Sequence, residues 1–314
     1  MNSSLAFDAD VLRRDAPDAH WTEGEGTGSQ ARCSVWWRAA GSLAGEKVGL
    51  IGHYRATDAS GSRRVLEQAC RTLAREGCTL AVGPMDGSAW RRYRLVTERG
   101  KAPPFFLEPD NPDDWPGHFR AAGFEPIASY TSAWEPLRDD EDPRLARAER
   151  RLAEQGVTIR AVDMARFDED LRRGYAVATV AFRRNFLYTD ISEQEFLEQY
   201  RLLKAAVKAE LAFLAMDGVV PVGFMLALPD LAQSRRGETL SQVVMKTAAI
   251  LPGRAYAGLG TVLMGRAKLA ARRLGFKAAI HALMHDANSS RNWSRGASVL
   301  RRYALFARRL GPGR

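Results

Sequence analysis

Two stretches of the chain share one order of sequence features, and this repetition constrains the fold more than any other property. Each stretch has a short apolar run, a turn that contains glycine, a helical pattern that ends at a second glycine, and another apolar run. The helical patterns span residues 61–77 and 260–275, so they are nearly equal in length. Apolar strands that alternate with helices are typical of α/β proteins. The sequence therefore predicts an α/β protein made of two similar halves.

The two halves divide into four segments. Residues 1–30 are poor in pattern, and we expect an N-terminal extension that is partly disordered. Residues 31–137 hold the first repeat, and residues 157–314 hold the second. Between them, residues 138–156 are highly charged and predict a linker with a surface helix. The second half reads as a strand, two helices, a hairpin, a strand, the glycine turn, a helix, a strand, a loop and a last strand.

Charge and composition limit the partners. The chain has 314 residues and a net charge of +9, which favours an anionic partner such as nucleic acid or a polyphosphate cofactor. The arginines are spread along the chain, which disfavours nucleic acid. No run of 18 apolar residues occurs, so we expect no membrane span. The cysteines Cys33, Cys70 and Cys78 follow no metal-ligand spacing, which predicts reduced thiols in the cytoplasm and no metal site.

The turn at residues 251–260, "LPGRAYAGLG", joins an apolar run to a helical pattern. Free backbone N–H groups and the positive end of the helix dipole make such a junction suitable for an anion. Gly258 and Gly260 would let the backbone approach a phosphate closely. A plain strand-to-helix turn is the alternative. The sequence contains neither a nucleotide P-loop nor a G-x-S-x-G nucleophile motif.

The order of elements in the second half resembles the GNAT family of acyl-CoA-dependent N-acyltransferases. The family carries Gln/Arg-x-x-Gly-x-Gly/Ala between its fourth strand and third helix, where backbone amides hold the CoA pyrophosphate. Residues 255–260 are Ala-Tyr-Ala-Gly-Leu-Gly, so Gly258 and Gly260 match the motif. Ala255 stands where Gln or Arg is usual, and Arg254 lies one place early. The resemblance covers Val157 to Leu310.

The first half also resembles this family, through "HFRAAGFEPIASYTSA", which is similar to its closing helix, bend and strand. The resemblance implies a tandem protein with two GNAT-like domains, a mixed and mostly antiparallel sheet flanked by helices, and one sheet that both domains can share. The first domain is truncated, and its turn "ATDASGSR" has one glycine. We therefore expect only the second domain to bind acyl-CoA, with an acetyl or longer acyl group, as co-substrate.

The resemblance also implies the residues that would contact the co-substrate. In the family, the fourth and fifth strands splay apart and the pantetheine arm lies in the gap. Here the fourth strand is residues 243–250, and the amides of Ala248 and Ile250 would bond the arm and polarise the thioester carbonyl. The predicted contacts with acyl-CoA are Ala248, Ile250, Arg254, Ala255, Tyr256, Ala257, Gly258, Leu259, Gly260, Thr261 and Asn288.

Two histidines on the fifth strand are candidates for proton transfer. Strand alternation would put His281 and His285 on one face. His285 lies at the end of the strand and is predicted to be the catalytic base, with a structural histidine as the alternative. His281 is expected to pack in the interior. Gly296 stands where the family often has a proton-donating Tyr, and Tyr303 is expected on the last strand, so no general acid is assigned.

Aromatic residues suggest where an acceptor could bind. Phe186 and Tyr188 precede the hairpin and could line an acceptor pocket. The segment from Trp90 to Tyr93 is expected to be a solvated helix start, with an anion site as the alternative.

The sequence thus predicts transfer of an acyl group from acyl-CoA to an amine, which could be a small molecule or a peptide. A non-catalytic acyl-CoA-binding or scaffold protein of the same fold is the main alternative, and a basic RNA-associated protein is a third. No motif names the acceptor or the oligomeric state.

Overall fold

The computed structural model describes residues 5–24, 28–138, 143–288, 293–294 and 296–311. Its strands form one 13-stranded sheet in the order β1-β2-β4-β5-β13-β7-β12-β11-β10-β9-β8, with β3 paired to β4 and β6 paired to β13. Only β4/β5 and β11/β12 are parallel among the described pairs. The predicted α/β class with a shared, mixed and mostly antiparallel sheet is confirmed.

The strands and helices are named in chain order. The strands are β1 Ala19–Glu23, β2 Ala31–Trp36, β3 Ser42–Leu43, β4 Glu46–Ala56, β5 Leu80–Gly83, β6 Leu95–Glu98, β7 Glu125–Pro136, β8 Val157–Ala161, β9 Ala212–Asp217, β10 Val220–Pro229, β11 Gln242–Ile250, β12 Ala278–His285 and β13 Ser298–Arg309. The helices are α1 Ala9–Asp15, α2 Ala59–Arg75, α3 Trp115–Ala121, α4 Pro143–Glu154, α5 Phe167–Ala181, α6 Glu193–Arg201, α7 Leu231–Arg235 and α8 Leu259–Arg273, with short 3-10 turns at Met164–Arg166, Lys204–Ala206 and Ala209–Leu211.

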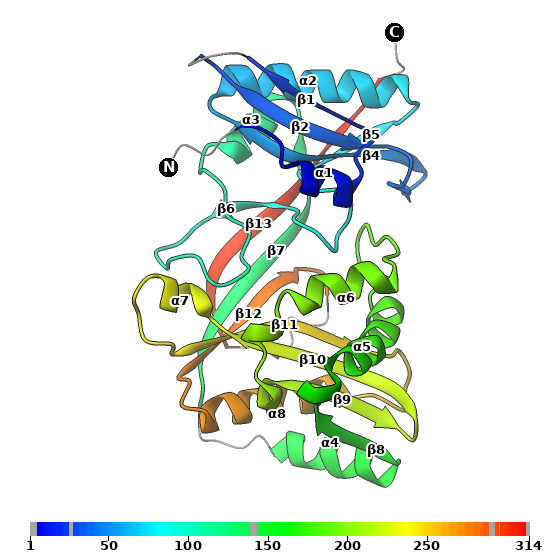
Figure 1. The fold of residues 1–314 in the computed structure, drawn as a ribbon, viewed down its shortest axis with the longest axis vertical. Helices are drawn as coiled ribbons and strands as arrows, with labels where there is room; N and C mark the ends of the chain where they lie inside the picture. The colour runs from blue at the N-terminus through cyan, green and yellow to red at the C-terminus, as the bar shows by residue number, and fades with distance from the viewer. Residues whose placement is uncertain (1–4, 25–27, 139–142, 289–292, 295, 312–314) are drawn as a thin grey trace.

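The last strands of the two halves are exchanged. The strand β7 ends the first half but pairs with β12 of the second half, and β13 ends the second half but pairs with β5 of the first. The two exchanged strands also pair with each other. Figure 1 shows β7 and β13 running side by side through the middle of the molecule. Because each half lacks a strand that the other supplies, the sheet of neither half is complete alone.

Helices cover the sheet according to their apolar faces. In the first half, α2 and α3 pack on one face through a cluster that includes Leu66, Cys70 and Phe119. In the second half, α8 and α4 pack on one face, and α5 and α6 pack on the other (Figure 1). Ser192 caps α6 by accepting the Glu195 N–H, as the capping-box spacing predicts. Across the residues that the structure describes, every helix is too short or too polar to span a bilayer.

Part of the N-terminal extension, residues 1–30, forms regular secondary structure that the sequence analysis did not predict. The helix α1 and the edge strand β1 lie in this segment, and β1 pairs with β2. Residues 1–4 and 25–27 lie outside the described residues. The strand was missed because it is a half-exposed edge strand with a weak apolar pattern. The surface helix expected in residues 138–156 is α4, and the hairpin β9/β10 turns at Gly218. The division into domains at residues 31, 138 and 157 remains a prediction.

Candidate functional site

A gap opens in the sheet between β11 and β12. Their parallel pairing ends at Met245 and His281, although both strands continue. On the other side of β11, the Leu251 N–H donates to the carbonyl of Val222 at 2.9 Å. Alternation along the strand directs the N–H groups of Ala248 and Ile250 away from β10 and toward the gap. That these two amides bind the arm of acyl-CoA remains a prediction.

A bulge in β11 borders the gap. Thr247 lies opposite Leu226 and Met245 lies opposite Ala227, which leaves Lys246 as the extra residue. The Thr247 hydroxyl lies 3.0 Å from the hydroxyl of Tyr200 on α6, and the Lys246 Nζ lies 5.7 Å from the centre of the Tyr200 ring. The bulge therefore turns two consecutive side chains to the α6 side of the sheet.

A second bulge lies in β12, between His281 and Met284. Leu283 has a φ of 57°, a left-handed conformation that strains a leucine. Its N–H donates to the Ser132 hydroxyl at 2.9 Å, and its carbonyl accepts a hydrogen bond from Arg94 at 3.0 Å. The bulge thus presents a carbonyl to an arginine of the first half.

The β12 bulge separates the two histidines, and the prediction that both lie on one face is wrong. His281 is buried and binds Glu135 at 2.6 Å, on the side where Lys268 of α8 also contacts Glu135. His285 instead packs against Phe186, which follows α5, at 5.8 Å between ring centres. The extra residue reverses the alternation between them. The expectation that His281 packs in the interior is confirmed.

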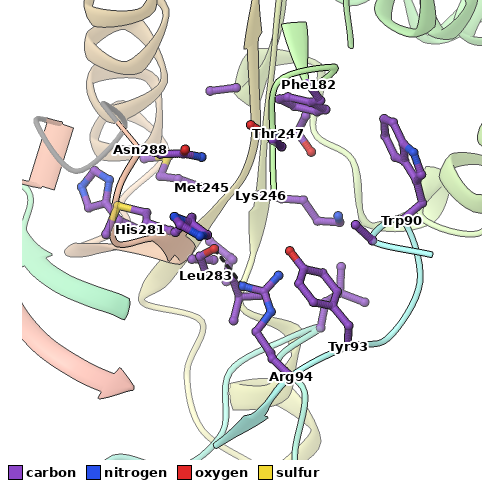
Figure 2. Close-up of a pocket in the computed structure, with 18 of the residues that line it drawn as sticks. Trp90, Tyr93, Arg94, Phe182, Met245, Lys246, Thr247, His281, Leu283 and Asn288 are labelled. Carbon is purple, nitrogen blue, oxygen red and sulfur yellow. Dashed lines mark hydrogen bonds between the residues drawn. The ribbon is translucent and has the colours of Figure 1, made fainter. Parts of the chain in front are cut away.

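A cavity of about 300 Å³ occupies the gap (Figure 2). It reaches both faces of the sheet, because Met264 and Trp293 belong to the α8 layer while Phe182 and Tyr200 belong to the α5 and α6 layer. The first half also contributes to its wall: Ala89, Trp90, Tyr93, Arg94, Phe105, Phe106 and Leu107. Five residues that the sequence analysis proposed for the site line this cavity: Phe186, Tyr188, Ala248, His285 and Asn288. The cavity is therefore shared by the two halves.

The glycine turn lies beside the cavity, at the start of α8. Gly258 precedes the helix with a φ of 84°. The N–H of Leu259 donates to the carbonyl of Tyr256, whereas the N–H groups of Gly260 and Thr261 have no partner in the described part of the chain. Two open N–H groups and the helix dipole suit a phosphate.

The side chains of the turn have varied positions. Leu259 is buried, so only its backbone can face a ligand, and the Tyr256 hydroxyl donates to Asp217 at 3.0 Å. The residues Arg254, Ala255, Ala257, Gly258 and Thr261 are exposed. Arg151 of α4 donates to the carbonyl of Ala257 and brings a positive charge to the turn. A turn with open amides and a nearby guanidinium fits a diphosphate, so these residues fit acyl-CoA.

Trp293 connects the turn to the cavity. A Cβ added at Gly260 would lie 2.4 Å from the Trp293 ring, so only glycine fits under this indole. The same tryptophan lines the cavity. Trp293 therefore contacts both the start of α8 and the cavity.

His285 has one free ring nitrogen. Its Nδ1 accepts the N–H of Ala287 at 3.1 Å, so in the neutral ring the proton is on Nε2. Nε2 is buried without a partner among the described residues. Burial lowers the pKa of His285, Asp286 opposes this shift, and the charge of Arg94 adds to it. The ring is therefore neutral at pH 7 and offers an Nε2–H donor.

The segment from Trp90 to Tyr93 is not a solvated helix start, and that prediction is wrong. The Trp90 indole N–H donates to the carbonyl of Thr189 at 2.9 Å, and its ring lies among Phe182, Tyr188 and Phe196. Arg94 and Lys246 were not proposed for the site. No local pattern marks them, because their roles depend on contacts between distant parts of the chain.

Comparison with solved structures supports an assignment of the fold. Neither a known family model nor a curated protein sequence matches the chain. Among solved structures, a GCN5-related N-acetyltransferase from Sphaerobacter thermophilus matches with a TM-score of 0.51 and 14% identity, over 98% of this chain and 87% of that one.

Two further structures are similar. A GCN5-related glucosamine N-acetyltransferase region of a fungal multi-domain GH3 β-N-acetylglucosaminidase matches 95% of this chain with a TM-score of 0.53 and 10% identity, and the match spans 34% of that protein. A tandem GNAT protein from the clavulanic acid biosynthesis pathway matches 96% of this chain and 87% of its own, with a TM-score of 0.47 and 14% identity. The resemblance predicted from the sequence is confirmed at the level of the fold: the chain has the fold of the GCN5-related N-acetyltransferases.

Proposed function

We propose that the protein transfers an acyl group from acyl-CoA to an amine at the gap between β11 and β12. The observation that supports this most directly is the open helix start beside a gap into which the amides of Ala248 and Ile250 point. Acyl-CoA would supply an activated thioester and a diphosphate. The turn residues 254–261 would hold the diphosphate, and Asn288 would contact the arm.

Residues from both faces of the sheet line the cavity, which suits a transfer between two substrates. Its α8 side adjoins the glycine turn, and its α6 side is lined by aromatic residues. The co-substrate and the amine would therefore approach the gap from opposite faces of the sheet. Phe186 and Tyr188 would contact the amine.

His285 would act on the reacting groups through its Nε2 atom. The sequence analysis proposed it as the base, which requires Nε2 without its proton. The hydrogen bond from Ala287 to Nδ1 keeps the proton on Nε2 and favours a hydrogen bond from this N–H to the carbonyl oxygen or to the departing sulfur. We therefore propose His285 as a donor and keep the base as the alternative that kinetics must separate.

A non-catalytic acyl-CoA-binding protein is the competing proposal. It has the same turn and the same gap, but it needs no amine pocket and no free Nε2. Release of CoA in the presence of amines separates the two, because a binding protein would retain acyl-CoA unchanged.

The experiment that tests binding uses a matched pair at Thr261, the exposed third residue of α8. Thr261→Asp places a negative charge beside the open amides, and Thr261→Asn has the same shape without the charge. Calorimetric titration with acetyl-CoA should show an affinity loss of about tenfold or more for the aspartate variant. The asparagine variant should bind within about twofold of the wild type, since only a small uncharged change is made.

The aspartate variant should fold normally, because a carboxylate in the first turn of a helix is favourable. Equal acetyl-CoA affinity in both variants would contradict the assignment of the diphosphate to this turn.

A further inference from the structure

We propose that the amine acceptor also carries a carboxylate, and that Arg94 and Lys246 bind this carboxylate inside the cavity. The inference rests on the proposed function, because it treats the α6 side of the cavity as the acceptor site. Two positive side chains from different halves of the chain point into this space (Figure 2).

Arg94 is a buried cation whose bonding is incomplete. Only 6% of its surface is exposed, and it lies between the rings of Tyr93 and Tyr130, at 3.8 and 4.0 Å. One nitrogen donates to the carbonyl of Leu283, but the buried Nε has no partner among the described residues. Burying a guanidinium is costly unless its N–H groups are satisfied. An anion in the cavity would satisfy it.

The backbone at Arg94 supports a functional reason for this placement. Its φ is 69°, a left-handed conformation that favours glycine and strains an arginine. Strain of this kind persists where the surroundings fix it, often at binding sites. The strained backbone and the Tyr93 and Tyr130 rings together direct the guanidinium into the cavity.

Lys246 is the second cation, and the β11 bulge turns it to the same space. No carboxylate in the described part of the chain forms an ion pair with it, and its Nζ lies 5.7 Å from the centre of the Tyr200 ring. The Lys246 side chain is exposed to the solvent that fills the cavity. Desolvation by the neighbouring protein atoms, followed by the charge of Arg94, lowers the pKa of the Lys246 ammonium. The two cations therefore repel each other without a counter-ion.

Nearby carboxylates are already engaged elsewhere. Glu195 binds Arg91, Glu108 binds Arg301, Glu135 binds His281, and Asp286 accepts from Thr131. No Asp or Glu lines the cavity among the described residues. A planar guanidinium beside an ammonium matches the two oxygens of a carboxylate, which accept charge-assisted hydrogen bonds. The missing counter-ion is thus the ligand itself.

The remaining lining favours an apolar body for this ligand. Trp90, Phe105, Phe182 and Phe186 face the cavity, and its volume of about 300 Å³ accommodates a ring with a short chain. The expected acceptor class is an aromatic or large apolar amine that bears a carboxylate, such as an amino acid.

Direct binding of simple probes tests the inference without acyl transfer. The probes are 3-phenylpropionate, its neutral amide 3-phenylpropionamide, and phenyl phosphate, each titrated into the full chain in the absence of CoA. The carboxylate should bind about tenfold or more tightly than the amide, since hydrogen bonds to charged groups are worth about 1.5–3 kcal/mol. Lys246→Met and Arg94→Gln should each remove this preference.

Controls keep the outcomes separate. Lys277→Met removes an exposed lysine outside the cavity and should leave probe binding unchanged. Lys246→Met should retain the acetyl-CoA affinity of the wild type. If the wild type itself does not bind acetyl-CoA, that result contradicts the proposed function and not this inference. Because Arg94 is buried, Arg94→Gln counts only if its unfolding transition matches that of the wild type.

Three results would overturn the inference. The first is equal affinity of the wild type for the carboxylate and the amide. The second is unchanged carboxylate affinity in Lys246→Met. The third is tighter binding of phenyl phosphate than of 3-phenylpropionate, which would assign the two cations to a phosphate.

Discussion

The two strand–turn–helix units of this molecule have the same order of elements but differ at the start of the helix. At α2, the Asp58 carboxylate accepts the Gly61 N–H at 2.8 Å and the Ser29 hydroxyl at 2.6 Å. At α8, Gly258 holds the equivalent position and supplies no side chain. A carboxylate at the first helix start satisfies the amides and repels other anions. One residue type thus decides whether the helix start remains open for an anion.

The gaps beside the two turns also differ: the first is filled by protein, and the second is open. The parallel pairing of β4 with β5 ends at Leu50 and Val82. Beyond it, the chain fills its own gap, because the Met85 N–H donates to the carbonyl of Ile51 at 2.8 Å and Asp86 accepts the His53 N–H at 2.6 Å. The β11/β12 gap instead holds the cavity. The first unit is closed by its own residues and supplies a wall for the second.

The largest expected effect comes from placing a carboxylate inside the open turn. Gly260→Asp should lower acetyl-CoA affinity about a thousandfold, because like charges about 4 Å apart cost ~4 kcal/mol at a surface dielectric near 20. The matched change in the first unit, Ser60→Asp, lies on the exposed start of α2 and should leave the affinity unchanged. Isothermal titration measures both, together with a stoichiometry of one acetyl-CoA per chain.

Sterics need their own control, because any Cβ at Gly260 meets the Trp293 ring. Gly260→Ala has the Cβ without the charge, so the difference between the two variants measures the electrostatic part. Binding of two acetyl-CoA molecules per chain would contradict the proposed difference in anion binding between the two units. An equal loss of acetyl-CoA affinity in Ser60→Asp would contradict it as well.

The second prediction concerns His285, which lines the cavity in the open gap. His285→Ala should lower kcat by about a hundredfold, which is within the usual range for a lost hydrogen-bond donor at the reacting group and also for a lost base. Acetyl-CoA affinity should change little, since the turn would hold the diphosphate. Steady-state CoA release with an amine that proves active measures kcat, and calorimetry measures the affinity.

The variant His285→Gln separates the two proton roles. A glutamine amide can donate a hydrogen bond but cannot remove a proton from an amine. Recovery of at least about a tenth of the wild-type kcat would support donation from Nε2. Activity as low as in the alanine variant would favour the base, and full activity in both would leave His285 with a structural role.

Local sequence signals predicted the elements that depend on neighbours in the chain. Gly275 ends α8, Ser192 caps α6, and Asp217–Gly218 turns the hairpin, as their residue types require. The glycine turn and the fourth strand were located in the same way. These features need only short-range backbone preferences, which the sequence displays directly.

Features that depend on distant contacts could not be predicted. The exchange of β7 and β13 leaves each strand pattern unchanged, and the β12 bulge that separates His281 from His285 has no glycine to mark it. Arg94 and Lys246 lie 152 positions apart in the numbering and meet only in the folded chain. A site built between two halves is therefore not visible in either half alone.

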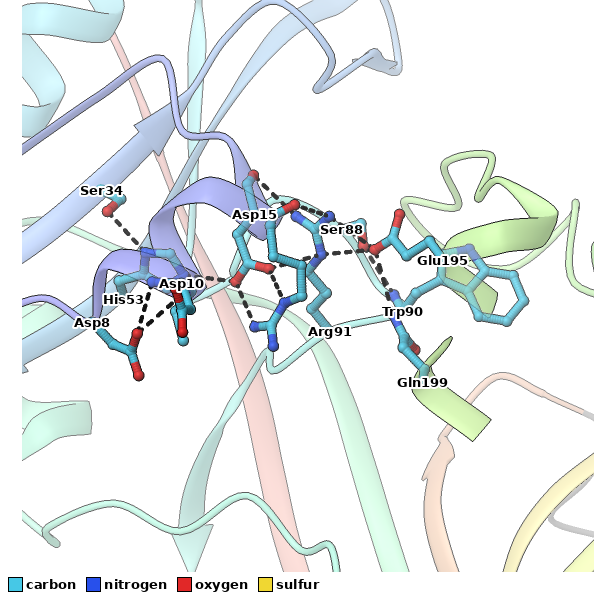
Figure 3. A network of polar contacts seen from close by, with 12 residues as sticks. Asp8, Asp10, Asp15, Ser34, His53, Ser88, Trp90, Arg91, Glu195 and Gln199 are labelled. Atoms are coloured by element: carbon cyan, nitrogen blue, oxygen red, sulfur yellow. Dashed lines mark hydrogen bonds and ion pairs between the residues drawn. The ribbon is translucent and has the colours of Figure 1, made fainter. Parts of the chain in front are cut away.

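A buried charge network joins the closed unit to the helices beside the open one (Figure 3). Asp15 of α1 binds His53 at 2.9 Å and Arg91 at 3.3 Å, and Arg91 binds Glu195 of α6 at 2.8 Å. Burial alone would raise the pKa of Asp15, but hydrogen bonds from His53 and Arg14 and the charge of Arg91 together lower it to about 2. Because Arg91 follows Trp90, this network braces the cavity wall.

The smallest expected effect follows from that network. A carboxyl whose pKa falls from 3.8 to about 2 on folding contributes about 2 kcal/mol, present above pH 4 and lost as the pH falls through 2. Asp15→Asn should therefore lower the free energy of unfolding by about 2 kcal/mol at pH 7 and by much less near pH 2. Urea unfolding at several pH values measures this, with Asp10→Asn, on the exposed side of α1, as the control. A difference between wild type and Asp15→Asn that stays constant from pH 7 to pH 2 would mean that the carboxylate charge does not hold the two units together.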